Sequence, residues 1–149
     1  MLNAGERDHA WIVAHVPHQG PMCLLDRVIE WDEQHIVCEA VSHRDSRNPL
    51  RDAGRLGAAT GVEYAAQAMA VHGALLAAQD ARPAAGYLTS VRGLGLHVDR
   101  IDDQPGPLRI EAERLSGDQR LILYQFAVHG AAGCLLEGRA SVVLDASTL

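Results

Sequence analysis

One carboxylate stands alone in the most apolar part of the chain. Between residues 56 and 79 the sequence reads LGAATGVEYAAQAMAVHGALLAAQ, and Glu63 carries its one charged side chain. A segment that is apolar nearly all round indicates a helix buried in the protein. Because burying a carboxylate is costly unless it is paired or put to use, Glu63 is the first candidate for proton-transfer chemistry. The alternative is a structural role, since Thr60 and Glu63 have the spacing of a capping box.

Gln67 and several histidines are the other residues of suitable type. Gln67 lies four residues after Glu63 on the same helix face, where it could hold the carboxyl group, contact a substrate or hydrogen-bond to core backbone. A histidine suits the role of general base because it titrates near neutral pH. His72 is nine residues past Glu63 and on the opposite face, which favours a core position, whereas His43 lies in a polar loop.

The chain shows no spacing typical of a metal, nucleotide or redox site. His15 and His18 are three residues apart, but a proline separates them and no third ligand is evident, so we expect no metal and no cofactor. Cys23, Cys38 and Cys134 are scattered through apolar stretches without a CxxC pair. This pattern favours buried free thiols in a reducing cytoplasm.

The length and amino-acid composition of the chain limit the class of protein to which it can belong. The 149 residues fit a single domain, 1–149, and a hydrophobic content of 48% is sufficient for a folded core. A formal net charge of −6 argues against nucleic-acid binding. The apolar segment is too short and too rich in Ala and Gly to span a membrane, and the N-terminus lacks a signal-peptide pattern. We therefore expect a cytoplasmic protein.

Residue patterning predicts a short helix, two strands, a long loop, one long helix and a run of strands. The short helix covers 5–16, the loop 42–58, and the long helix runs from about Thr60 to Asp80. The expected strands are 23–31, 35–41, 86–98, 108–115, 120–130 and 133–144. One antiparallel sheet wrapped around one helix satisfies this order, which gives an α+β fold.

Two segments resemble those of a known family. PHQGPMCLLDRVIEWD (17–32) is similar to the start of the first strand in bacterial 3-hydroxyacyl-(acyl carrier protein) dehydratases, and GVEYAAQAMAVHGAL (61–75) to their central helix. The Pro-His…Gly-Pro-Met turn and the Gly-Val-Glu-Tyr-Ala-Ala-Gln helix resemble more closely the dehydratase-like proteins of aryl polyene clusters. The resemblance implies the hotdog fold, a strongly curved antiparallel sheet wrapped around one long central helix.

The resemblance also implies roles for particular residues. Glu63 would be the catalytic carboxyl group, and His18 the base or an orienting residue, with a purely structural tie of the turn as the alternative for His18. Backbone N–H groups at the buried helix start, near Gly61 and Val62, are suited to stabilise the thioester oxygen. Tyr64, beside the helix acid, is a further substrate-binding candidate.

One departure from the family concerns its catalytic histidine. The ordinary dehydratases carry this residue in a Gly-His-Phe-Pro-Gly segment, about fourteen residues before the helix acid. Here that position is Pro49, within RNPLRDAG. Either another histidine of the chain serves, or the chain is not itself the catalyst.

We therefore expect a 3-hydroxyacyl thioester dehydratase of fatty acid or polyene-type acyl biosynthesis, acting on an acyl carrier protein or coenzyme A thioester. The alternatives are an acyl thioesterase and a non-catalytic accessory subunit of a heteromeric hotdog dehydratase. The expected assembly is a homodimer or higher oligomer, or a heterodimer with a paralogous hotdog protein. Four loop arginines could meet the acidic surface of a carrier protein: Arg44, Arg47, Arg51 and Arg55.

Overall fold

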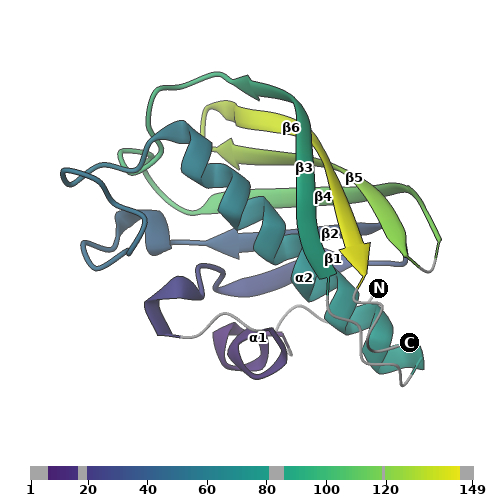
Figure 1. Ribbon diagram of the computed structural model, residues 1–149. Coiled ribbons are helices and arrows are strands. Elements are labelled where there is room, and N and C mark those ends of the chain that lie inside the picture. The colour runs from purple at the N-terminus through teal and green to yellow at the C-terminus, as the bar shows by residue number, and fades with distance from the viewer. Residues whose placement is uncertain (1–6, 17–19, 81–85, 119, 145–149) are drawn as a thin grey trace.

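A six-stranded antiparallel sheet and one long helix make up most of the molecule. The computed structural model describes residues 7–16, 20–80, 86–118 and 120–144. The strands are β1 (Arg27–Trp31), β2 (His35–Ala40), β3 (Gly86–Leu96), β4 (Leu108–Gly117), β5 (Leu121–Gly130) and β6 (Gly133–Leu144). They lie in the order β1-β2-β4-β5-β6-β3, and the sheet curves around α2 (Gly61–Asp80), as Figure 1 shows. This is the α+β architecture that the patterning predicted.

Short helical segments complete the fold. They are α1 (His9–His15) and the 3₁₀ turns η2 (Gly20–Met22), η3 (Ser42–Arg44) and η4 (Ala58–Thr60). The Asp8 carboxylate caps α1 by accepting the Trp11 N–H at 3.1 Å. α1 packs against α2 beside β1, the edge strand at the bottom of the sheet in Figure 1.

Alternation along the strands separates a covered face of the sheet from an open one. On β4 the side chains of Leu108, Ile110 and Ala112 are buried, and the residues between them are exposed or partly exposed. The register places Ile110 opposite Cys38 of β2 and Val128 of β5, so a buried row crosses three strands beneath α2. Burial of each large aliphatic side chain contributes about 1.5–3 kcal/mol, which stabilises the wrapped sheet.

The small residues of α2 let the helix lie close to the sheet. A Cβ atom on Gly61 would come within 2.5 Å of Leu136 Cδ2 on β6. Only glycine fits this approach without a shift of Leu136. The close contact fixes the first turn of α2 relative to β6, and therefore fixes the helix residues that follow.

The long loop between β2 and α2 is ordered by bonds to its own backbone. Arg51 donates to three carbonyl oxygens of the loop at 2.7–3.0 Å, those of His43, Asp45 and Gly54. The Asp102 carboxylate accepts the Leu56 N–H at 3.0 Å. Asp102 also pairs with Arg100, which holds the pKa of the Asp102 carboxyl group well below its usual range. The loop is thus tied to the segment that follows β3.

Three sequence expectations about element boundaries were wrong. α1 begins at His9 and not at residue 5, because Asp8 is its N-cap. β1 begins at Arg27, four residues later than predicted, because the Leu24 N–H is bonded to the side chain of Gln67 and not to a neighbouring strand. Thr60 lies inside η4 and its hydroxyl donates to Gly57 O at 2.7 Å, so Thr60 is not the N-cap of a capping box. The other strand boundaries lie within two residues of those predicted. None of the helices in the described residues is both long enough and apolar enough to cross a bilayer.

Candidate active site

Gln67 joins the first half of α2 to the segment that precedes β1. Its side chain is fully buried. The amide oxygen accepts the Leu24 N–H at 2.9 Å, and the amide nitrogen donates to Met22 O at 2.7 Å and to Glu63 Oε1 at 3.2 Å. These bonds use both donor hydrogens and the acceptor oxygen of the amide. The Glu63 carboxylate is therefore fixed relative to residues 22–24.

Glu63 combines this fixed position with access to solvent. It lies in the first turn of α2 and is partly exposed, whereas Tyr64 and Ala65, which follow it, are fully buried. A carboxyl group that is both held in place and reachable meets the geometric requirements of proton transfer to a bound molecule.

Tyr64 ties the long loop to α2. Its hydroxyl lies 2.9 Å from Ser42 Oγ and accepts an N–H of Asn48 at 3.1 Å, while the Ser42 hydroxyl donates to Leu24 O at 2.7 Å. Tyr64 therefore donates to Ser42, and burial raises the pKa of the Tyr64 hydroxyl. The sequence suggested that Tyr64 binds substrate. In the structure its fully buried ring and engaged hydroxyl position the loop, and substrate binding by Tyr64 stays a prediction.

The start of α2 offers fewer hydrogen-bond donors than the sequence suggested. η4 runs directly into α2, and the Gly61 N–H is bonded to the carbonyl oxygens of Ala58 and Ala59. The Gly61 N–H is thus already engaged, and Gly61 lies close to Leu136, while its role toward a thioester oxygen stays a prediction. The same role for the Val62 N–H stays a prediction.

His43 is buried and bonded inside the protein. Its ring is fully buried, and Nε2 donates to Gln104 O at 3.0 Å on the far side of the loop. Burial lowers the pKa of His43, so the ring is neutral at pH 7. His72 is buried in the core, as predicted. His18, the candidate base, lies outside the described residues.

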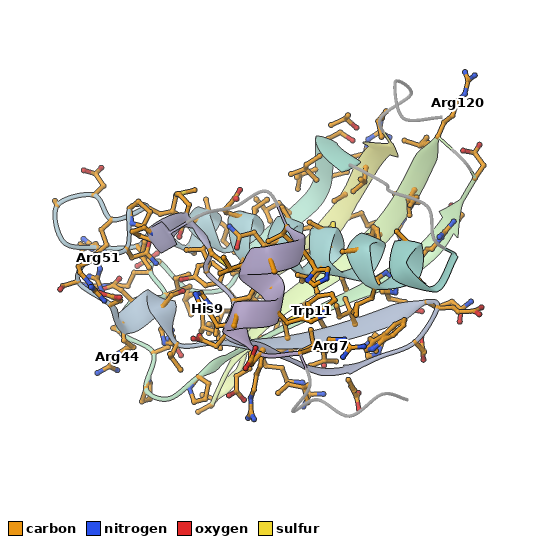
Figure 2. All side chains as sticks on the ribbon, turned by 90° about the horizontal axis from the view of Figure 1, so that it is seen from below. Arg7, His9, Trp11, Arg44, Arg51 and Arg120 are labelled. Carbon is orange, nitrogen blue, oxygen red and sulfur yellow. The ribbon has the colours of Figure 1, made fainter. Side chains whose placement is uncertain are left out.

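The loop arginines divide into internal and exposed residues. Arg51 supports the loop backbone, whereas Arg44 and Arg47 are exposed, with Arg44 donating to Gln104 O at 3.1 Å and Arg47 paired with Asp45 at 3.2 Å. Figure 2 shows Arg44 and Arg51 at one end of the molecule and Arg120 at the opposite end. Arg55 is also exposed, so three of the four arginines of the predicted cluster lie at the surface.

The family of the chain follows from a comparison with known families. The profile of the ApeP-like family, described as ApeP dehydratase, matches residues 11–148. The chain belongs to the ApeP-like family. Among curated proteins there is no significant match. Family membership confirms the resemblance that the Pro-His turn and the Glu63 helix carried in the sequence.

Solved structures show the fold of this ApeP-like chain. The dehydratase heterocomplex ApeI:P from Xenorhabdus doucetiae matches with a TM-score of 0.81 and 22% identity, over 92% of this chain and 93% of that chain. A thioesterase from Haemophilus influenzae matches at 0.59 and 12% identity, over 89% and 81%. A hypothetical thioesterase with coenzyme A from Streptococcus pneumoniae matches at 0.55 and 11% identity, over 79% and 84%. The predicted hotdog fold is confirmed, and the similar structures include a dehydratase complex and thioesterases.

Sequence reasoning missed part of the framework that this ApeP-like chain builds around Glu63. Ser42 and Asn48 lie in a polar stretch that reads as a solvated loop, and nothing marks residues 22–24 as partners of Gln67. The only available signal was the cost of leaving Gln67 unpaired in an apolar helix, which requires partners somewhere in the fold. This cost did not identify the partners of Gln67, because they are distant in sequence.

Proposed function

We propose that this chain is the carboxyl-bearing subunit of a 3-hydroxyacyl thioester dehydratase whose substrate is attached to an acyl carrier protein. The observation that carries the proposal is the partly exposed Glu63 carboxylate, held by Gln67 in the first turn of a buried helix. Membership in the ApeP-like dehydratase family supports it.

The reaction needs two proton transfers at neighbouring carbon atoms. A base removes a proton from C2 of the acyl chain, and negative charge builds on the thioester oxygen. The C3–O bond then breaks, and the hydroxyl group takes a proton and leaves as water. We assign that proton to the Glu63 carboxyl group, since a positioned general acid accelerates such a step about 10²–10⁴-fold. The proton taken from C2 restores the acid, so the reaction needs no further reactant. Val62 N–H is our candidate donor to the thioester oxygen.

The base is either His18 or a histidine of a partner subunit. His18 stands two residues before Gly20–Met22, and Gln67 binds the Met22 carbonyl oxygen. Pro49, at the position of the family's usual histidine, is exposed and cannot accept a proton from carbon. A partner that carries the Gly-His-Phe-Pro-Gly segment would supply the missing base.

A paralogous hotdog protein is the partner that we propose. β3 forms one edge of the described sheet, and it exposes the side chains of Leu88, Leu94 and Leu96. An exposed apolar edge strand favours pairing with another strand. The similar structure from Xenorhabdus doucetiae is a dehydratase heterocomplex, ApeI:P, which supports a heterodimer over a homodimer.

Hydrolysis of the thioester is the second candidate function. Thioesterases share this fold, and a carboxylate in the position of Glu63 could activate a water molecule for attack on the thioester carbon. Both reactions use the same carboxyl group, so only the products distinguish them.

Product analysis with and without the partner tests the proposal. The chain is purified alone and with a paralogous hotdog protein of the same organism, and each sample is offered a 3-hydroxyacyl and a saturated acyl thioester of acyl carrier protein. Mass spectrometry measures loss of water, and a thiol reagent measures hydrolysis. An enoyl product supports dehydration, and its appearance only with the partner assigns the base to that partner. Free thiol from the saturated substrate, or no product in either sample, would overturn the proposal.

A further inference from the structure

Three side chains with metal-binding atoms converge on the face of the sheet opposite α2. His97 directly follows β3, and Cys134 and Glu137 lie on β6. Leu136 packs against the start of α2, so its neighbour Glu137 projects from the other face. The His97 N–H is bonded to Leu135 O at 2.8 Å, which fixes the backbone of His97 against β6. The three side chains therefore share one surface although His97 is far from the other two in sequence.

The distances between the candidate ligand atoms fit a single ion. Glu137 Oε2 lies 3.2 Å from His97 Nε2 and 3.4 Å from Cys134 Sγ. The three ligand atoms lie within 4.8 Å of one another. Around a tetrahedral Zn²⁺ ion with bonds of about 2.0–2.3 Å, neighbouring ligand atoms are about 3.3–3.6 Å apart. Small side-chain rotations are enough to enclose an ion.

A hollow of about 280 Å³ is lined by two of the three candidate ligands, Cys134 and Glu137. The small side chain of Ala127 lines it, because Ala127 stands in register between Glu111 of β4 and Glu137 of β6. His129 also lines the hollow, and its Nε2 lies 3.4 Å from Glu111 Oε2. The hollow gives an ion a path from solvent and leaves room for a water ligand.

Cys134 differs from the other cysteines in its exposure. Of the three cysteines, all of them in described segments, Cys134 alone is partly exposed, so the expectation of three buried thiols was wrong for this residue. The Glu137 carboxylate stands beside the Cys134 thiol, whose proton a cation can replace.

We propose that His97, Cys134 and Glu137 form a binding site for a zinc-class divalent cation, with water as the fourth ligand. A sulfur, a nitrogen and an oxygen ligand suit Zn²⁺, whereas Mg²⁺ and Ca²⁺ prefer oxygen alone. As the S–Zn bond forms, the S–H bond breaks and the proton goes to solvent, so affinity rises with pH. The ion links the end of the edge strand β3 to β6. The site stands apart from Glu63 and does not depend on the proposed function.

Calorimetric titration of the tag-free full chain with Zn²⁺ tests the proposal. We expect one ion per chain and a rise in melting temperature on binding. Cys134→Ser and His97→Ala should each weaken binding at least about 100-fold, because even residues outside the ligand shell cost 10–100-fold when they are changed. His35→Ala is the matched control, since His35 lines the same hollow without belonging to the ligand set, and binding should be unchanged.

Titration with Co²⁺ gives a second readout that a general loss of affinity cannot imitate. Thiolate coordination should produce a sulfur-to-cobalt charge-transfer band in the near ultraviolet, and Cys134→Ser should remove it while circular dichroism shows an unchanged fold. Cys23 and Cys38 remain in that variant as buried thiols. A band that persists in Cys134→Ser, no ion bound by the parent chain, or equal losses in His35→Ala and His97→Ala would each overturn the site.

Discussion

The two halves of α2 each bury a polar side chain, and they differ in what that side chain holds. In the first half, Gln67 binds the segment before β1 and also the Glu63 carboxylate, which reaches the surface. In the second half, His72 Nδ1 is bonded to the Tyr124 hydroxyl at 2.7 Å and Nε2 to Asp32 O at 2.8 Å. One half of the helix therefore positions a group that can meet a substrate, and the other half joins the helix to the sheet.

Burial and hydrogen bonding together distinguish side chains that can act on a substrate from side chains that only stabilise the fold. Both ring nitrogens of His72 are engaged inside the protein, and burial lowers the pKa of the ring. Such a residue has no atom left for a substrate. Gln67 is equally saturated, yet one of its bonds acts on a partly exposed carboxylate. We therefore expect changes at Glu63 to affect turnover, changes at His72 to affect stability, and changes at Gln67 to affect both.

The largest effect should follow from Glu63→Gln. This substitution keeps the size of the side chain and removes the acidic proton, so dehydration should fall about 10²–10⁴-fold. The melting temperature should stay within about 2 °C of the parent, because the side chain is not part of the core. Glu33→Gln, an exposed carboxyl-to-amide change in the β1–β2 loop, is the matched control. Full activity of Glu63→Gln in the complex would assign the chain an accessory role.

His72→Ala should have the opposite pattern, a loss of stability with an unchanged catalytic rate. The substitution leaves the Tyr124 hydroxyl and Asp32 O without their partner inside the protein and opens a cavity. The free energy of unfolding should fall by about 2–4 kcal/mol, measured by urea denaturation. The catalytic rate of the folded fraction should be unchanged below the melting temperature. A specific loss of rate at unchanged stability would make the second half of α2 part of the active site.

Gln67→Ala should combine the two effects at smaller size. The Leu24 N–H and Met22 O lose their buried partner, which should cost about 1–3 kcal/mol of unfolding free energy. Activity should fall about tenfold because the Glu63 carboxylate is less well fixed. In the Glu63→Gln background the stability loss should remain and the further activity loss should vanish. Additive activity losses in that double variant would show that Gln67 does not act through Glu63.

The smallest effect is a dependence of stability on pH. Burial lowers the folded-state pKa of His72 below its unfolded value of about 6.5, so the unfolded state binds more protons between the two values. Stability should therefore fall as pH drops through this window, by at most about 1.4 kcal/mol per pH unit for this ring. As the pH is lowered from 7 to 5, the urea midpoint should fall less steeply in His72→Gln than in the parent chain. An equal slope in the variant and the parent would exclude His72 as the source of the pH dependence. Among the described residues, His43 is the other histidine whose pKa is lowered by burial.

Local patterning was sufficient for most of the fold, and insufficient for the surroundings of Glu63. The strands from β3 to β6 were placed within two residues, because alternation and the Ala131-Ala132 turn are local signals. The sequence also marked Gln67 as a partner of Glu63, since the two are one helical turn apart. The partners of Tyr64 depend on contacts between distant segments, and the bonds of the Gly61 N–H depend on an extra 3₁₀ turn, so local patterning predicted neither.

The order of elements, the single acid of the apolar helix and the family resemblance were all determined by the chain itself, because they rest on periodicity and on residues close together in sequence. Only the tertiary structure decided which polar groups form hydrogen bonds inside the protein. Gln67 binds residues more than forty positions away, and Cys134 meets His97 only because β6 and β3 pair in the sheet. Hydrogen bonds and ligand sets are satisfied by whatever the fold brings within about 3 Å, and sequence spacing does not encode that distance.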